Sequence, residues 1–163
     1  MEELFKLKAV DMTLFEDEKS KNRALIEEIL PDLAVIEVGS TAVPSLIGKN
    51  DVDFLVLTEE GTFSHVCSQL SKNFPVDNKQ VSNSAYRAFV LPSTFDMKLQ
   101  VTSSPEKYGM FIDFLNILKA NQSTFKAYTN LKKRFHGKSM SAYRNEKGEF
   151  IKSVLEMNKR NKP

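Results

Sequence analysis

The amino-acid sequence predicts an α/β (α+β) domain, in which helices flank a small mixed β-sheet and a helical segment follows the sheet. In the first two-thirds of the chain, short β-prone apolar runs alternate with amphipathic stretches, and after Thr102 only helical patterns occur. The 163 residues contain no internal repeat or long linker, which suits one domain over residues 1–163. We expect its core at about residues 15–103 and the helical segment at about 104–160.

Four β-prone apolar runs are the expected strands of the small mixed sheet. These runs are Leu33–Val38, Val52–Leu57, Tyr86–Leu91 and Phe95–Val101. The last two are predicted to be neighbours joined by a turn at Pro92 and Ser93. Helical spacing of apolar residues predicts two helices in this part, Asp17–Leu30, which Pro31 ends, and Thr62–Asn73.

Three more helices are predicted in the last third, over Glu106–Ala120, Gln122–Phe135 and Met140–Met157. The first begins well, since Ser104 can cap it and Pro105 suits its first turn.

The charge of the chain is nearly balanced, at +2, so it lacks the strong positive field of a dedicated nucleic-acid binder. Basic residues nevertheless gather in the last third, including Lys132, Lys133, Arg134, Lys138, Arg144, Lys159, Arg160 and Lys162. They form either solvated helix faces or a basic surface that handles phosphate, in a substrate or in RNA.

Other features of the sequence exclude several classes of protein. The single cysteine, Cys67, rules out an internal disulfide and a thiolate metal cluster. His65 and His136 have no partner at the spacing of metal ligands, so we expect no catalytic role for them. No apolar run approaches the ~20 residues that span a bilayer, and the first residues do not resemble a signal peptide. We therefore expect a cytoplasmic protein that does not bind membranes.

The segment from Val35 to Leu57 carries the chemistry. One strand ends at Gly39-Ser40, and after a loop over Thr41–Asn50 the next begins with Asp51-Val52-Asp53. Side chains two apart on a strand share a face, so both carboxylates should project together. Adjacent carboxylates repel each other unless a cation lies between them, and Mg²⁺ suits a few carboxylates with phosphate oxygens.

The turn before this strand is suited to phosphate. Gly39 lets the backbone approach a ligand closely, and Ser40 can offer a hydroxyl and a backbone N–H. Thr41, the next residue, is a further candidate to bind phosphate. A Gly-Ser pair or an Asp-x-Asp alone is common in ordinary turns, but the two together, between two apolar strands, are a far more specific signal.

This combination resembles the signature of the DNA polymerase β-type nucleotidyltransferase superfamily, in which a Gly-Ser turn holds the triphosphate and an acidic pair binds metal. The stretch Val38-Gly39-Ser40-Thr41-Ala42-Val43-Pro44-Ser45-Leu46, followed by Lys49 and Asp53, further resembles the GrpB family. Weaker similarities follow at Phe111–Leu115, at Tyr128 with Leu131-Lys132, and at Tyr143 with Lys147 and Phe150-Ile151. The resemblance thus covers nearly the whole chain.

The chain also departs from the family pattern. Val38 stands where the family usually has His, Ser45 replaces Gly, and Asn50 replaces Pro. Asp51 is additional and restores a full Asp-x-Asp. The family's His-Leu-His-Val strand is here Lys98-Leu99-Gln100-Val101, which removes any chemistry those histidines perform.

The resemblance to nucleotidyltransferases implies a third carboxylate on an adjoining strand, and Asp96 is the candidate. Alternation places Asp96, Lys98 and Gln100 on one face. That face is either part of the site or a solvated sheet edge at which Lys98 pairs with Asp96. Lys49 and Lys98 are candidates to bind phosphate, and Arg87, Tyr143 and Lys147 are candidates to line the cleft, although Tyr143 also suits plain helix packing.

We therefore expect a nucleotidyltransferase that uses Mg²⁺ (or Mn²⁺) and transfers a nucleoside monophosphate from an NTP to an unidentified acceptor. Asp51, Asp53 and Asp96 are the expected catalytic and metal-binding residues. Two alternatives stay open. One is a nucleotide-binding or regulatory module without turnover, and the other is an RNA- or protein-binding module that uses the basic C-terminal helices.

Overall fold

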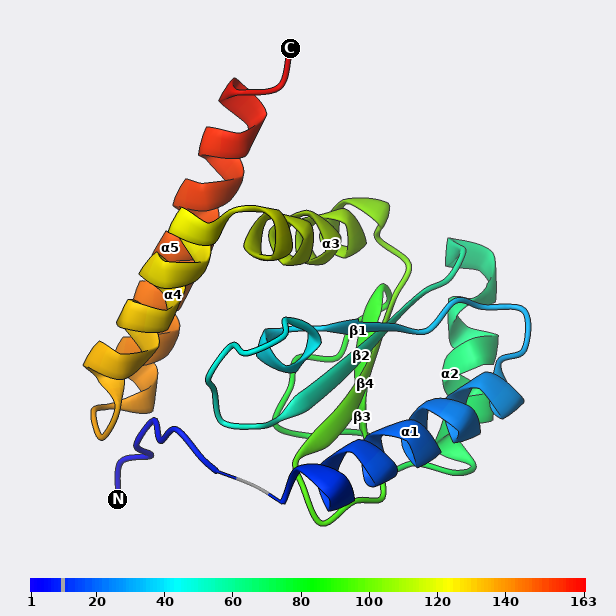
Figure 1. The fold of residues 1–163 in the computed structure, drawn as a ribbon. Coiled ribbons are helices and arrows are strands. Elements are labelled where there is room, and N and C mark those ends of the chain that lie inside the picture. The colour runs from blue at the N-terminus through cyan, green and yellow to red at the C-terminus, as the bar shows by residue number, and fades with distance from the viewer. Residues whose placement is uncertain (10) are drawn as a thin grey trace.

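The computed structural model describes residues 1–9 and 11–163 and contains a four-stranded mixed sheet (Figure 1). The strands β1 (Ile36–Val38), β2 (Val52–Leu57), β3 (Tyr86–Val90) and β4 (Met97–Thr102) lie in the order β1-β2-β4-β3. The central pair, β2 and β4, is parallel, and the two outer pairs are antiparallel. The predicted mixed sheet is confirmed, as is the pairing of the last two strands.

One face of the sheet carries the main apolar core. The helices α1 (Met12–Ile29) and α2 (Phe63–Ser71) cover this face, and α2 follows the short 3₁₀ helix η2 (Glu60–Thr62). Phe15 and Ile26 of α1 pack with Phe54 of β2 and Leu99 of β4 in this core. Because side chains alternate along a strand, Asp53, Lys98 and Gln100 point to the opposite face.

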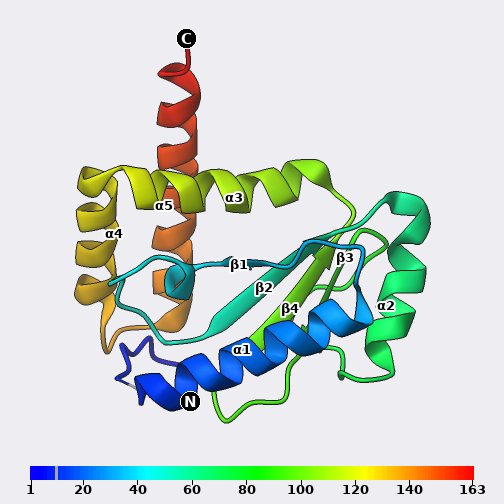
Figure 2. The same cartoon turned by 45° about the vertical axis from the view of Figure 1, so that its right-hand side comes forward.

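The helical C-terminal segment covers that opposite face. It consists of α3 (Pro105–Ala120), α4 (Gln122–Phe135) and α5 (Met140–Arg160), and Figure 2 shows α3 crossing beside the sheet, with α4 and α5 side by side at one end. The predicted cap is confirmed, since the Ser104 hydroxyl accepts a hydrogen bond from the backbone N–H of Lys107. No helix in the described residues has the length and apolar character needed to cross a membrane.

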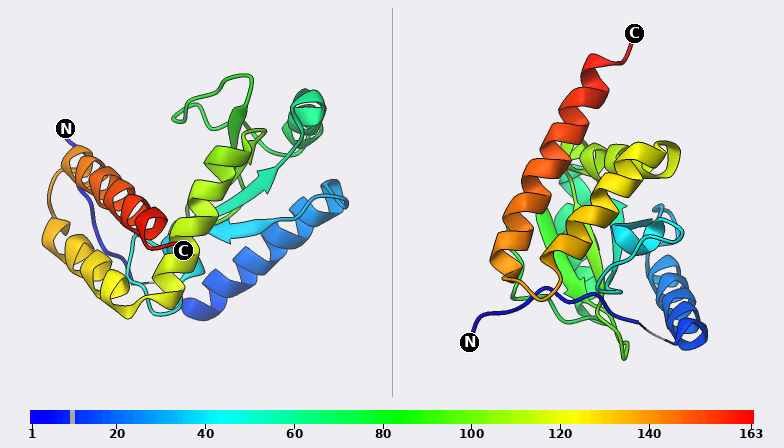
Figure 3. Two further views of the ribbon diagram at one scale, coloured as in Figure 1. Left: turned by 90° about the horizontal axis from the view of Figure 1, so that it is seen from above. Right: turned by 60° about the vertical axis from the view of Figure 1, so that its left-hand side comes forward.

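The N-terminal segment, residues 3–8, joins distant parts of the chain. Its backbone bonds to the turn between α4 and α5, where the Phe5 N–H donates to the Lys138 carbonyl at 2.8 Å. Phe5 is fully buried and its ring stacks on Tyr143 with centroids 3.7 Å apart. The Lys8 N–H donates to the Gly48 carbonyl at 3.0 Å. Figure 3 shows this segment running along the ends of α4 and α5 toward α1.

Candidate active site

The Gly-Ser turn lies directly beside the second aspartate. Val38 pairs with Asp53 across β1 and β2, so the chain turns at Gly39 next to the Asp53 carboxylate. Gly39 has φ 80° and ψ −166°, a conformation that is essentially restricted to glycine. A Cβ atom at this position would lie 3.6 Å from Asp53 Oδ2. The turn then continues into the 3₁₀ helix η1 (Ser40–Ala42).

The two aspartates lie close together, and the charge of Asp51 acts on Asp53. Burial, followed by the negative charge of Asp51, raises the pKa of Asp53 from its usual 3.8 to about 6, although the hydrogen bond from Gln100 opposes this. Asp51 forms an ion pair with Lys49 at 3.3 Å. Within residues 1–9 and 11–163, Asp53 forms no ion pair within 4.0 Å, so its charge is less compensated than that of Asp51.

This donor set fits one divalent cation. A carboxylate whose pKa is raised by a neighbouring carboxylate gains from a shared positive charge, and carboxylate oxygens are the ligands that Mg²⁺ prefers. The third predicted ligand is not brought into such a group. No cluster of three or more His, Cys, Asp or Glu side chains among the described residues is placed to hold a metal ion.

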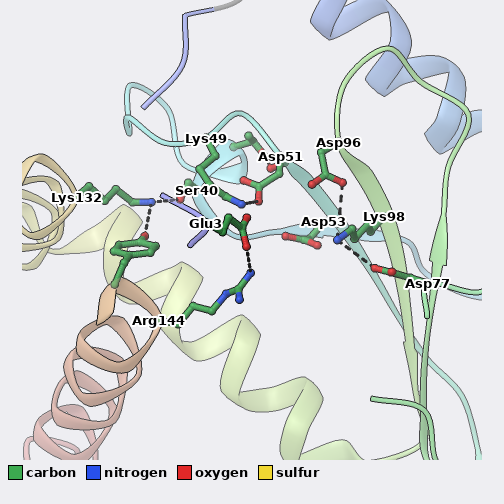
Figure 4. A network of polar contacts seen from close by, with 12 residues as sticks. Glu3, Ser40, Lys49, Asp51, Asp53, Asp77, Asp96, Lys98, Lys132 and Arg144 are labelled. Carbon is green, nitrogen blue, oxygen red and sulfur yellow. Dashed lines mark hydrogen bonds and ion pairs between the residues drawn. The ribbon is translucent and has the colours of Figure 1, made fainter. Parts of the chain in front are cut away.

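Asp96 instead belongs to a separate group of charges around Lys98 (Figure 4). Lys98 forms an ion pair with Asp77 at 3.1 Å and another with Asp96 at 3.8 Å. The side chain of Asp96 is half exposed, whereas that of Asp77 is buried. Burial acts to lower the pKa of Lys98, but the hydrogen bond to Asp77 and the charges of Asp96, Asp77 and Asp53 raise it overall.

A hydrogen-bonded chain of neutral groups also reaches Asp53. The Tyr86 hydroxyl donates to Gln100 Oε1 at 2.9 Å, and Gln100 Nε2 donates to Asp53 Oδ1 at 3.1 Å. Burial, followed by the charges of Asp53 and Asp77, raises the pKa of Tyr86 to about 12, so this hydroxyl keeps its proton at neutral pH.

A buried lysine approaches the turn from the helical segment. Lys132 of α4 is only 2% exposed, and its Nζ donates to Ser40 Oγ at 2.7 Å and to the Tyr143 hydroxyl at 3.2 Å. The rings of Tyr128, Tyr143 and Phe5 surround this ammonium at 4.7–5.9 Å from their centroids. Burial, followed by the charge of Lys147, lowers the pKa of Lys132 from 10.5 to about 7, against the attraction of Asp51.

Asp51, Asp53, Tyr86, Lys98 and Gln100 face a cleft of about 440 Å³ between the sheet and the helical segment, whereas Lys132 and Ser40 are not among its lining residues. Met140, Tyr143 and Phe111 contribute its helical wall. Its cationic lining residues are Lys49, Lys98, Lys107, Arg144 and Lys147, and its acidic ones are Asp51, Asp53 and Asp96. The structure therefore gathers most of the predicted site residues into one cleft that combines carboxylates with a larger number of cations.

A family comparison identifies the chain at this point, because a family model described as GrpB protein matches residues 8–157. The chain belongs to the GrpB family. A UPF0157 protein of Vibrio cholerae is 26% identical over 131 residues, which cover 80% of this chain and 70% of the relative.

Solved structures agree on the fold. The crystal structure of conserved protein GrpB from Enterococcus faecalis has a TM-score of 0.68 at 20% identity, over 93% of this chain and 98% of that one. A mutant of the Cid1 poly(U) polymerase bound to MgATP has a TM-score of 0.50 at 13% identity, over 72% of this chain and 39% of that one. The fold of this GrpB protein is therefore nucleotidyltransferase-like.

Four predicted site residues of this GrpB protein do not line the cleft, namely Gly39, Ser40, Thr41 and Arg87. Gly39 and Ser40 form the turn beside Asp53. Arg87 is not in the cleft, because it pairs with Val101 across β3 and β4, and that pair faces the core beneath α2. Thr41 is also outside the lining of the cleft, and its hydroxyl donates to the backbone carbonyl of Asp51 at 3.5 Å. Arg87 points away from the cleft because side chains alternate between the two faces of a strand. Thr41 points away from it because of the direction of the 3₁₀ helix η1.

The basic C-terminal residues of this GrpB protein divide into two kinds. Lys132 is buried, contrary to the interpretation of a solvated helix face. The remaining members of the predicted basic set are exposed, namely Lys133, Arg134, Lys138, Arg144, Lys159, Arg160 and Lys162. Lys132 was missed although the sequence contains a signal for it, since Tyr128, Leu131 and Phe135 place it within the apolar stripe of its helix.

Proposed function

We propose that this GrpB protein binds a nucleoside triphosphate with Mg²⁺ (or Mn²⁺) in the cleft and transfers the nucleoside monophosphate to an acceptor hydroxyl. One observation carries the proposal. The turn at Gly39, which only glycine adopts readily, lies against Asp53: a Cβ atom placed on Gly39 would be 3.6 Å from a carboxylate oxygen of Asp53. A phosphate held at the turn would therefore lie beside the carboxylate pair.

The residues around the turn suit a triphosphate. Ser40 can donate its hydroxyl hydrogen to a phosphate oxygen while its oxygen accepts from Lys132. Lys49 and Lys147 line the same cleft and add positive charge. Asp51 and Asp53 would hold the cation, which supplies charge neutralisation at the phosphates.

The transfer itself is a single displacement at phosphorus. The acceptor oxygen bonds to the α-phosphorus, the bond from that phosphorus to the bridging oxygen breaks, and pyrophosphate leaves. Asp96, which lines the cleft and is half exposed, is the proposed acceptor of the hydroxyl proton.

Nucleotide binding tests the proposal directly. ATP, GTP, CTP and UTP are titrated with and without Mg²⁺ into the wild type, the Asp51→Asn/Asp53→Asn variant and the control variant Asp32→Asn, whose substitution is on an exposed loop. We expect Mg²⁺-dependent binding that the double variant loses and the control keeps. The proposal fails if no nucleotide binds, or if the double variant binds as well as the wild type.

A nucleotide-binding module without turnover is the second candidate. The observation in its favour is Gln100, whose amide occupies Asp53 Oδ1 on the strand where a third carboxylate was expected. Release of pyrophosphate in the presence of nucleotide, Mg²⁺ and a set of hydroxyl acceptors separates the two candidates. Tight binding without any release would favour the module.

A further inference from the structure

The parallel pairing of β2 and β4 places a lysine beside the metal-binding carboxylates. Asp53 and Lys98 are register partners, so their side chains leave the same face of the sheet next to each other. Figure 4 shows the Lys98 ammonium between the Asp53 carboxylate and those of Asp96 and Asp77. A fixed positive charge thus stands on one side of Asp53.

The Lys98 ammonium is anchored on the side away from Asp53. Its ion pair with Asp77 is short, at 3.1 Å, and the Asp77 carboxylate is only 5% exposed. The backbone N–H of Lys79 also donates to Asp77 Oδ1, which fixes the carboxylate. Moving Lys98 away from this place would leave a buried carboxylate without its cation, which is costly.

The other cleft residues at this strand, Asp96 just before β4 and Gln100 on it, also oppose a second cation. Asp96 is engaged by Lys98, and Gln100 presents its NH₂ group to Asp53, because the Tyr86 hydroxyl occupies its Oε1 atom. An amide NH₂ group donates hydrogen bonds and offers no lone pair to a metal. On this side of Asp53 the chain therefore supplies one ammonium and one N–H donor.

We infer that the site takes a single divalent cation, held by Asp51 and Asp53, and that the Lys98 ammonium is the positive charge on the side of Asp53 where a second cation would otherwise bind. The inference rests on the proposed function, because it assumes that the cation binds with a nucleotide. It makes the cleft a one-metal site in which the protein supplies the other charge. An acceptor hydroxyl would then meet a lysine and an aspartate rather than a second metal.

Counting bound Mn²⁺ tests this inference. Free Mn²⁺ has a strong paramagnetic resonance signal, which bound Mn²⁺ loses, so titration of the full chain with Mn²⁺ and a non-hydrolysable ATP analogue gives the ratio per protein. Free analogue and the Mn²⁺ that it carries are removed by gel filtration, and the Mn²⁺ of the protein complex is then released with acid and counted. We expect one Mn²⁺ per wild-type chain and none in Asp51→Asn/Asp53→Asn.

A variant that removes both obstacles should bind a second ion. In Lys98→Met/Gln100→Glu the ammonium is lost and a carboxylate replaces the amide, and Asp77→Asn is added so that no buried carboxylate is left without its cation. We expect two Mn²⁺ in this triple variant, with its fold checked by circular dichroism. One Mn²⁺ in the folded triple variant would contradict the role of Lys98.

The wild-type count decides the inference even if the triple variant does not fold. Two Mn²⁺ per wild-type chain would overturn the inference and leave the proposed function standing. A count of zero, with no binding of the analogue, would overturn both.

Discussion

The ammonium of Lys132 lies 2.7 Å from the hydroxyl of Ser40, although 92 positions separate the two residues in the chain. Gly48 makes this approach feasible, since a Cβ there would lie 3.2 Å from Ser40 Cβ and 3.6 Å from Lys132 Nζ. The contact joins the helical segment to the turn at the end of β1. The helical segment is therefore part of the candidate site.

Replacing Lys132 by methionine should lower nucleotide affinity without lowering the stability of the fold. Methionine has a similar length and removes a buried ammonium, so we expect an unfolding free energy at pH 7 no lower than that of the wild type. Nucleotide affinity should fall about tenfold or more, because a hydrogen bond to a charged group contributes about 1.5–3 kcal/mol. Calorimetric titration and urea unfolding measure the two quantities.

The neighbouring Lys133 offers a matched control, since it lies on the same helix and is exposed. Lys133→Met should change neither quantity appreciably. Equal loss of affinity in both variants would show that general charge, rather than the Ser40 contact, is responsible.

The lowered pKa of Lys132, about 7 instead of 10.5, should make the fold more stable as the pH rises. Above pH 7 the folded chain gives up this proton while the unfolded chain keeps it until about pH 10. The unfolded state then binds more protons, so stability increases with pH between these values, by at most about 1.4 kcal/mol per pH unit. Urea unfolding at pH 7, 8 and 9 should show this rise in the wild type and a smaller one in Lys132→Met. The same rise of unfolding free energy with pH in both proteins would contradict the lowered pKa of Lys132.

The raised pKa of Asp53, about 6 instead of 3.8, changes stability with pH in the opposite direction. Between these values the folded chain holds the proton that the unfolded chain has lost, so stability falls as the pH rises toward 6 and stays lower above it. Without metal, Asp53→Asn should therefore unfold at pH 7.5 with a free energy about 1–2 kcal/mol higher than the wild type.

Excess Mg²⁺ with nucleotide should raise the stability of the wild type but not that of Asp53→Asn, because only a chain that binds the ligand gains from it. Asp113→Asn, an exposed substitution on α3, serves as the control and should follow the wild type. An Asp53→Asn protein less stable than the wild type at pH 7.5 would refute the assigned electrostatics.

Gly39→Ala tests the turn. An alanine forced into φ 80° and ψ −166° should cost about 1–3 kcal/mol, and its methyl group would stand against Asp53 Oδ2. We expect lower stability together with loss of nucleotide binding. Gly109→Ala in α3 is the control, since nothing lies within 4 Å of its Cβ position and helix formation favours alanine by about 0.5–1 kcal/mol. Thermal melting and nucleotide titration of both variants would decide the matter.

The spacing of apolar residues in the sequence predicted those helices and strands whose apolar residues recur regularly on a buried face. The bounds of β2 (Val52–Leu57) and α4 (Gln122–Phe135) agree with the prediction, because polar or turn-forming residues stand directly at their ends. The start of α1 was missed by five residues. Its cap is Asp11, whose carboxylate accepts from the N–H groups of Thr13 and Leu14, and the first turn includes the buried Phe15, which the prediction left outside the helix.

The candidate site was predictable where it is local and not where it is assembled from distant segments. Gly39, Asp51 and Asp53 belong to one strand–loop–strand unit, so their proximity follows from spacing. The contacts of Lys132 with Ser40 and of Lys98 with Asp77 depend on how separate elements pack. Phe5 lies in a short stretch that mixes apolar and charged residues, and this stretch by itself does not indicate that Phe5 is fully buried.

The placement of residues 3–8 sets an order of events during synthesis on the ribosome. These residues are synthesised before the elements described above, yet Phe5 finds its backbone and ring partners only at Lys138 and Tyr143. The four strands can pair before those partners exist, whereas the pocket around Lys132 must wait for α4 and α5. A nascent chain would thus hold a finished sheet with an open Gly39 turn while α4 and α5 are still being translated.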